Sequence, residues 1–128
     1  MIILISLFVE ANEMKAKSEA EINSIAQNVV DCLLGIDELK INKIFMYGSY
    51  ARGDANEESD LDIMVLCDDN EENIDKKRCD INKISNRISL EHDIDVSVKI
   101  KDYKTFNEWI GVVPFYQNIN NEGIVIYG

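Results

Sequence analysis

The amino-acid sequence predicts an α/β (α+β) fold with a small sheet, and three local patterns carry this prediction. Between residues 21 and 34, apolar side chains recur every three or four positions, as on one face of an amphipathic helix. The runs 44–47, 61–67 and 94–100 are short and apolar or strictly alternating, as in buried or half-buried strands. Because helical and strand patterns alternate along the chain, we expect helices packed on one sheet.

The first helix and first strand lead to a Gly-Ser turn. The helical pattern stops at Gly35, which is a natural helix end. The apolar run from Ile44 to Tyr47 then ends at Gly48 and Ser49, so a buried strand is expected to deliver this turn at its C-terminal end. A functional site is expected at the mouth of that strand.

The next strand is predicted from Leu61 to Cys67, because alternate residues separate apolar from acidic side chains. Asp60, Asp62 and Met64 share one face, opposite Leu61 and its alternate neighbours. A polar loop over 68–72 and a second, sheet-covering helix are expected to follow, with the apolar positions Ile74, Ile81, Ile84 and Ile88.

The last third of the chain predicts one more strand and two short helices. The alternating run 94–100 has one apolar and one polar face, and Asp95 lies on the polar one. Asp102 can cap a helix that runs through Trp109, Pro114 can open another, and Gly123 can close it before the apolar run 124–127.

The composition is that of one soluble domain. A chain of 128 residues with 46% apolar and 29% charged residues predicts a single domain over residues 1–128. The net charge of −11, from 24 acidic and 13 basic residues, disfavours a nucleic-acid template or duplex as partner. Cys32, Cys67 and Cys79 form no C-x-x-C pair, which is typical of a reducing, cytoplasmic compartment, and we expect them in core or half-buried positions.

The N-terminal run from Met1 to Val9 is apolar, but it lacks the positive region and cleavage site of a signal peptide. It is also too short to span a bilayer, so no membrane association is expected. Three interpretations of residues 1–13 stay open: an extra strand, a partner-binding arm, or translated sequence upstream of a start at Met14.

Three acidic residues predict a metal site. Asp60 and Asp62 lie two apart on a strand, so their carboxylates point the same way, and Asp95 can join them from an adjacent strand. Carboxylates are the ligands that Mg²⁺ prefers, and two Mg²⁺ ions about 3.5–4 Å apart can clamp the attacking and leaving oxygens of a nucleotidyl transfer. Asp95 can also orient the incoming hydroxyl, although nearby Mg²⁺ would keep it charged and makes a general-base role the weaker assignment.

The Gly-Ser turn predicts a phosphate site. Gly48 lets the backbone approach a phosphate closely, and the hydroxyl and amide of Ser49 can donate to phosphate oxygens. Arg52 can contact a triphosphate or tie down the following loop through Asp54, Glu57 or Glu58, and the structural role is slightly favoured. Ser59 is interpreted as a loop-capping hydroxyl.

Each of these features alone is common: a turn, a solvated strand edge, an exposed carboxylate. Their joint spacing favours the functional interpretation. Asp93 competes with Asp95 for the third position, but Asp95 lies deeper in the strand pattern. His92 is expected to end the second helix or lie in its loop, since Mg²⁺ sites rarely recruit imidazole.

The segment GSYARGDANEESDLDIMV resembles the G-S-x-A-R-G…S-D-x-D signature of the DNA polymerase β-like nucleotidyltransferase superfamily. From about Glu21 to the end, including PFYQNINNEGIVIYG, the chain is similar to the minimal nucleotidyltransferase (MNT) family, which is often encoded beside a HEPN-domain protein. The resemblance implies a small mixed sheet, Mg²⁺ as cofactor and ATP as donor. It assigns Gly48 and Ser49 to the nucleotide, and Asp60, Asp62 and Asp95 to metal and catalysis.

The resemblance also implies a function. Better-understood members of the family act as antitoxins that transfer AMP to a tyrosine of a HEPN ribonuclease toxin, and an acidic protein suits a basic, RNA-binding partner. Two alternatives stay open: nucleotidyl transfer to a small hydroxylated molecule such as an antibiotic, and an antitoxin that only binds. Because 128 residues leave little room for an acceptor pocket, the acceptor is expected on another macromolecule or across a homo- or hetero-oligomeric interface.

Overall fold

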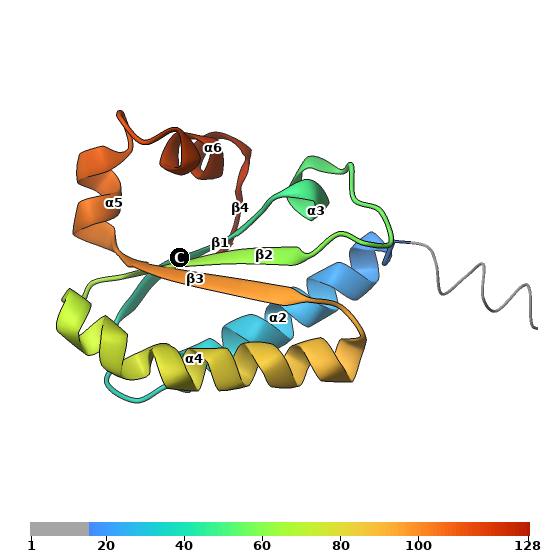
Figure 1. Cartoon of the computed structure of the whole chain (residues 1–128), viewed down its shortest axis with the longest axis horizontal. Coiled ribbons are helices and arrows are strands. Elements are labelled where there is room, and N and C mark those ends of the chain that lie inside the picture. The colour runs from blue at the N-terminus through green and yellow to red at the C-terminus, as the bar shows by residue number, and fades with distance from the viewer. Residues whose placement is uncertain (1–15) are drawn as a thin grey trace, which may run out of the picture.

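The computed structural model describes residues 16–128 and shows a mixed sheet with helices on both faces (Figure 1). The expectation for residues 1–13 lies outside the described residues. The elements, in chain order, are α2 (Glu19–Leu34), β1 (Ile41–Tyr47), α3 (Ser49–Arg52), β2 (Leu61–Cys67), α4 (Glu71–His92), β3 (Val96–Asp102), α5 (Tyr103–Trp109), α6 (Pro114–Glu122) and β4 (Ile124–Tyr127).

The sheet has the strand order β3-β2-β1-β4. β1 pairs antiparallel with β2 and with β4, whereas β2 and β3 run parallel. The parallel pair needs a crossover connection, and α4 supplies it. The predicted α/β fold with a mixed sheet is therefore confirmed.

One face of the sheet is covered by α2 and α4, which lie side by side beneath it in Figure 1. Their apolar stripes pack against the alternate residues of the strands, including Leu61, Ile63 and Val65, in one core cluster. α2 begins with a capping box between Ser18 and Glu21, which pairs two otherwise unsatisfied backbone N–H groups. Both predicted helices on this face are confirmed, and so is the end of the first at Gly35.

The opposite face is covered in part by α5 and α6. A second, smaller cluster forms there between alternate strand residues and the two helices: Phe45, Met64, Leu66, Phe106 and Ile119. Asp102 caps α5 by accepting a hydrogen bond from the Thr105 amide at 2.9 Å. The short helices predicted after Asp102 and Pro114 are confirmed, and so is the end of the second at Gly123.

Three expectations are wrong in detail. The polar loop predicted over 68–72 ends early, because the Asn70 side chain accepts from the Asn73 amide and starts α4 at Glu71. β3 starts at Val96, so Asp95 lies just before the strand and not within it. Cys79 is exposed on α4, whereas Cys67 is buried as expected.

Within the part of the chain that the structure describes, none of the helices combines the length and apolar character needed to cross a bilayer.

Candidate active site

The Gly-Ser turn leaves the C-terminal end of β1, as the sequence predicts. Gly48 has φ +78°, a left-handed conformation that disfavours residues with a side chain. A Cβ at this position would also collide with Oδ2 of Asp62. Only glycine therefore lets the turn lie directly against this carboxylate.

Asp62 is the more enclosed of the two carboxylates in the D-x-D. It is half-buried and pairs with Tyr47 across the β1–β2 ladder. Burial raises its pKa, and the charge of Asp60 raises it further, while Lys99 and Arg52 lower it. Two like charges held near a half-buried position are unfavourable alone, and a bound cation would relieve their repulsion.

Asp95 lies beside Asp60 because β2 and β3 are parallel neighbours. The ladder pairs Leu61 with Val96, and the Leu61 amide donates to the Asp95 carbonyl at 2.8 Å. The competing residue, Asp93, is the left-handed C-cap of α4 with φ +50°. The structure thus places Asp95 next to the D-x-D and gives Asp93 a role in ending the helix.

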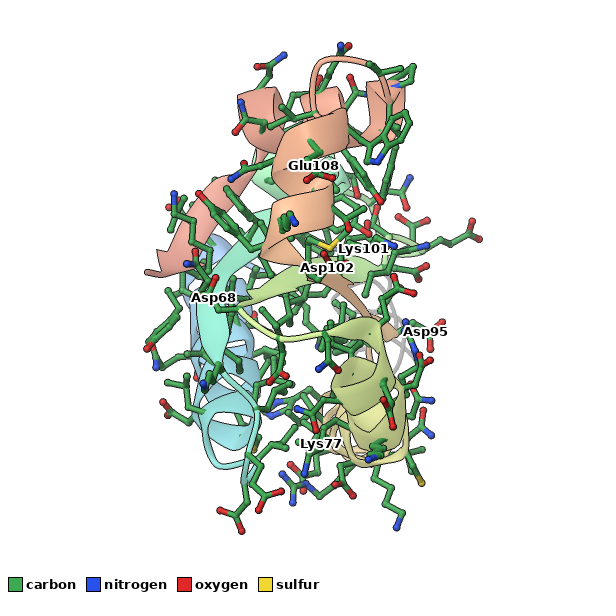
Figure 2. All side chains as sticks on the ribbon, turned by 90° about the vertical axis from the view of Figure 1, so that its left-hand side faces the viewer. Asp68, Lys77, Asp95, Lys101, Asp102 and Glu108 are labelled. Atoms are coloured by element: carbon green, nitrogen blue, oxygen red, sulfur yellow. The ribbon has the colours of Figure 1, made fainter. Side chains whose placement is uncertain are left out.

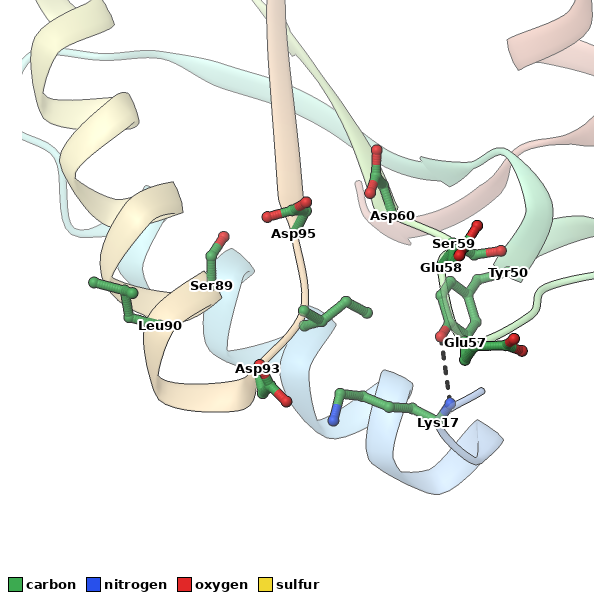
Figure 3. A pocket seen from close by; sticks show the side chains of 11 residues that line it. Lys17, Tyr50, Glu57, Glu58, Ser59, Asp60, Ser89, Leu90, Asp93 and Asp95 are labelled. Atoms are coloured by element: carbon green, nitrogen blue, oxygen red, sulfur yellow. Dashed lines mark hydrogen bonds between the residues drawn. The ribbon is translucent and has the colours of Figure 1, made fainter. Parts of the chain in front are cut away.

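Two cavities adjoin these carboxylates. The first, of about 320 Å³, lies between the Gly-Ser turn and α6, and Asp62 lines it. The second, of about 440 Å³, contains Asp60 and Asp95, with Lys17 and Tyr50 on its other side (Figure 3). The structure therefore divides the three predicted carboxylates between two cavities, with Asp62 in the first and Asp60 and Asp95 in the second.

The donor atoms suit Mg²⁺. Among the described residues, no three acidic, histidine or cysteine side chains are gathered closely enough to form a complete metal cage. Mg²⁺ is commonly held by one or two carboxylates together with substrate phosphates, and it keeps several waters. A carboxylate pair beside the Gly48–Ser49 turn fits that mode, so Asp60, Asp62 and Asp95 stay the predicted ligands.

Three neighbouring side chains have structural roles. Arg52 pairs with Asp54 at 3.3 Å, as favoured from the sequence, and also with Glu122 of α6 at 3.7 Å. The Ser59 hydroxyl accepts from the Asn56 amide at 2.9 Å, which confirms its place in the loop. His92 is the last residue of α4, as expected. Because Arg52 also lines the smaller cavity, its predicted contact with nucleotide stays a prediction.

Sequence reasoning missed three side chains at the site. Lys99 follows Asp95 by two strand alternations, so it lies on the same sheet face and acts electrostatically on Asp62. Phe115 and Asn118 of α6 line the cavity that contains Asp62. The alternation could have placed Lys99, but no local pattern shows that α6 folds back over the Gly-Ser turn.

The far end of β3 is structural. Figure 2 shows Lys101 and Asp102 at the base of α5, away from Asp95. Lys101 pairs with Glu71 at the start of α4, with 3.0 Å between Nζ and Oε1. This end of the strand therefore anchors helices and contributes nothing to the two cavities.

Comparison with known proteins gives the family. Residues 27–128 match the family model described as polymerase beta, nucleotidyltransferase. Two relatives are candidate protein adenylyltransferases of Methanocaldococcus jannaschii, MJ0604 and MJ0141. They are 34% and 35% identical to this chain over 89 residues, which is 69% and 68% of this chain and 80% of each relative.

A solved structure from Sulfolobus solfataricus shares the fold. A crystal structure described as a nucleotidyltransferase candidate from Sulfolobus solfataricus superposes with a TM-score of 0.55 at 16% identity, over 88% of this chain and 90% of that one. A toxin-antitoxin structure with AMP-PNP has a TM-score of 0.49 at 24% identity, over 84% of this chain and 73% of that one. The matched model and the two relatives show that the chain belongs to the polymerase β nucleotidyltransferase family and is a nucleotidyltransferase.

Proposed function

We propose that this protein is a Mg²⁺-dependent adenylyltransferase that transfers AMP from ATP to a tyrosine of a HEPN-type toxin and thereby silences it. The observation that carries the proposal is the position of the Gly48–Ser49 turn directly against Asp62, with Asp60 and Asp95 beside it. This arrangement offers a place for phosphates next to carboxylates that can hold a divalent cation.

The donor side is built from the turn. The Ser49 hydroxyl and amide are available to donate to phosphate oxygens, and Lys99 adds positive charge on the same sheet face. Asp60 and Asp62 would hold Mg²⁺, which, when bound, neutralises phosphate charge and favours departure of pyrophosphate. The α-phosphate would then have to lie within reach of Asp60 and Asp95, which line the second cavity.

The transfer itself is a displacement at phosphorus. The acceptor hydroxyl oxygen forms a bond to the α-phosphorus while the bond from that phosphorus to the bridging oxygen breaks, and pyrophosphate leaves with the electron pair. The hydroxyl proton passes to water or to a carboxylate oxygen of Asp95, which is exposed at the edge of the second cavity. Because this cavity is open to solvent, a side chain on another protein can reach the site.

A protein acceptor is supported by the relatives, which are named as candidate protein adenylyltransferases. The resemblance of the sequence to the MNT family supports a HEPN toxin as that protein. The net charge of −11 agrees with a basic, RNA-binding partner, because opposite charges speed association and favour correct pairing.

The test is intact-mass spectrometry of the protein that the neighbouring gene encodes, after incubation with the enzyme, Mg²⁺ and each nucleoside triphosphate in turn. We expect a mass increase of one or more AMP units with ATP. The increase should require Mg²⁺ and fall by roughly 10²–10³-fold in rate for Asp60→Asn or Asp62→Asn, because each removes one charged ligand.

The control is Asp68→Asn, which removes a carboxylate at the opposite end of β2. It should leave the transfer rate unchanged. Stable complex formation without any mass increase, combined with full toxin protection by Asp60→Asn, would contradict the enzymatic proposal and favour an antitoxin that only binds. Peptide mapping would identify the modified residue and so test the tyrosine assignment.

A further inference from the structure

The cavity between the Gly-Ser turn and α6 has two chemically different ends. At one end lie Gly48, Ser49 and Asp62, which suit phosphates and a cation. On the α6 side lie the Phe115 ring and the Asn118 carboxamide, together with Glu122, whose carboxylate pairs with Arg52 at 3.7 Å. A nucleotide has the same division, with charged phosphates at one end and an aromatic base that carries polar edges at the other.

The geometry of α6 aims these two side chains into the cavity. Ile119 is buried in the smaller core cluster with 1% of its surface exposed, and it fixes the rotation of the helix. Phe115 and Asn118 lie four residues and one residue before it, on the side of α6 that faces the turn. Phe115 keeps 39% of its surface exposed, which is unusual for a phenylalanine next to a core cluster.

The Phe115 ring is held in place by its neighbours, one of which, Lys99, lies over the ring. The Tyr47 ring meets it edge-to-face at 5.7 Å between centroids, with an 84° interplanar angle. The Lys99 ammonium lies 5.7 Å from the ring centroid and also lowers the pKa of Asp62, so it is close to both ends of the cavity. A ring that is positioned in advance loses little entropy when a planar ligand stacks on it.

We propose that Phe115 and Asn118 form the nucleobase subsite of the donor, with Phe115 stacking on the base and Asn118 reading its edge. This inference rests on the proposed function, because it takes the triphosphate to lie at Gly48 and Ser49. Stacking favours the larger purines over pyrimidines. A carboxamide pairs with the adjacent amino donor and N7 acceptor of adenine, whereas guanine presents two acceptors at those positions. The subsite therefore favours ATP.

The test is equilibrium binding of ATP, GTP and CTP to the full chain by calorimetry, with Mg²⁺ and without any acceptor protein. Wild type is expected to bind ATP more tightly than GTP, and both more tightly than CTP. Phe115→Leu keeps an apolar side chain of similar size but removes the aromatic face. It should weaken ATP binding by roughly 5-fold to 150-fold, and Phe115→Tyr should restore it.

Asn118→Leu should narrow the preference for ATP over GTP, while Asn120→Leu is the matched control. Asn120 is an exposed asparagine on the same helix that does not line the cavity, so its variant should bind like wild type. Circular dichroism melting of each variant separates a lost contact from a lost fold.

Two results would overturn the subsite: equal affinity of wild type for all three nucleotides, or unchanged binding by both Phe115→Leu and Asn118→Leu. Failure of the proposed function looks different, because the predicted binding pattern would then be present while the HEPN protein gains no mass. Transfer by wild type with no effect of the α6 variants on nucleotide affinity would leave the proposed function standing and remove the subsite.

Discussion

Among the described residues, sixteen buried side chains form one continuous core between the sheet and the helices α2 and α4, whereas five form the cluster between the sheet and the helices α5 and α6. The larger core fills the space between the sheet and these two helices, and the cavity that Asp60 and Asp95 line opens beside it, at Ser89 and Leu90 of α4. The smaller core covers only part of its face, and the rest holds Asp62, Lys99 and the cavity beside α6. A small domain thus obtains most of its stability on one side of a sheet and keeps the other side available for chemistry.

The largest expected effect comes from deleting one buried side chain on each face. Phe106→Ala should lower the free energy of unfolding by about 3–5 kcal/mol and Leu33→Ala by about 2–5 kcal/mol, because both leave cavities in a packed core. Only Phe106→Ala should also weaken ATP binding, since Phe106 packs against Tyr116, which contacts Phe115.

Urea denaturation and calorimetry of the folded variants, at a temperature where both are native, would measure the two quantities. An equal loss of ATP affinity in Leu33→Ala would show that the two faces are not independent.

The next prediction separates the cost of backbone strain from the cost of the clash between an added Cβ and the Asp62 carboxylate. Gly48 and Gly53 both have left-handed φ angles, +78° and +85°, but an added Cβ meets Asp62 only at Gly48. Alanine at either position should cost about 1–2 kcal/mol of stability through strain. Only Gly48→Ala should also displace the Asp62 carboxylate and slow AMP transfer by roughly a hundredfold.

Melting temperatures and transfer rates of the two alanine variants would test this difference. A comparable loss of rate in Gly53→Ala would assign the effect to the shape of the loop and not to the carboxylate.

A smaller loss of stability is expected from Asp102, the residue that caps α5 on the face of the sheet that also holds Asp62. Burial raises the pKa of Asp102, but hydrogen bonds from Thr105 outweigh it and hold the pKa below the usual carboxyl range. Because the folded state favours the charged form, the contribution of Asp102 to stability is complete above the ordinary carboxyl pKa and disappears as the pH falls through the lowered one.

Asp102→Ala should therefore cost about 0.5–2 kcal/mol at neutral pH. Asp102→Asn keeps a capping oxygen but loses the charge, so its difference from wild type should shrink as the pH is lowered below about 4. Unfolding titrations at a series of pH values would check both, and a difference that grows in acid would contradict the assignment.

The last prediction compares the reactivity of two thiols, one buried in the larger core and one exposed on the outer surface of α4. Burial raises the pKa of the Cys67 thiol to about 12, and the charges of Asp69 and Asp68 add to the shift, whereas Cys79 is exposed. Since the thiolate is the reactive form, brief alkylation near pH 8 should label Cys79 in the native protein, and Cys67 only after unfolding. Peptide mass spectrometry would quantify both. Rapid native labelling of Cys67 would show that this core opens readily.

Local patterns in the sequence predict the elements well, because each depends on near neighbours. The bounds of β2, the stop at Gly35 and the cap at Asp102 follow from alternation, glycine and a capping carboxylate. The start of β3 was predicted at Ile94, but the chain does not become strand until Val96, after Asp93 has ended α4. Where a helix end and a strand start compete for the same residues, periodicity alone cannot divide them.

The sequence alone predicted the residues of the candidate site: a Gly-Ser turn, the D-x-D of Asp60 and Asp62, and a further carboxylate at Asp95. It could do so because strand spacing and residue type are local properties. The folded structure places Asp62 at one cavity and Asp60 and Asp95 at another, and it brings Phe115 and Asn118 of α6 to the turn, which the sequence did not predict. These placements depend on strand order and on helix packing between residues that are 35 positions apart, for Asp60 and Asp95, to 70 positions apart, for Gly48 and Asn118. The chain carries no local signal for contacts at such separations.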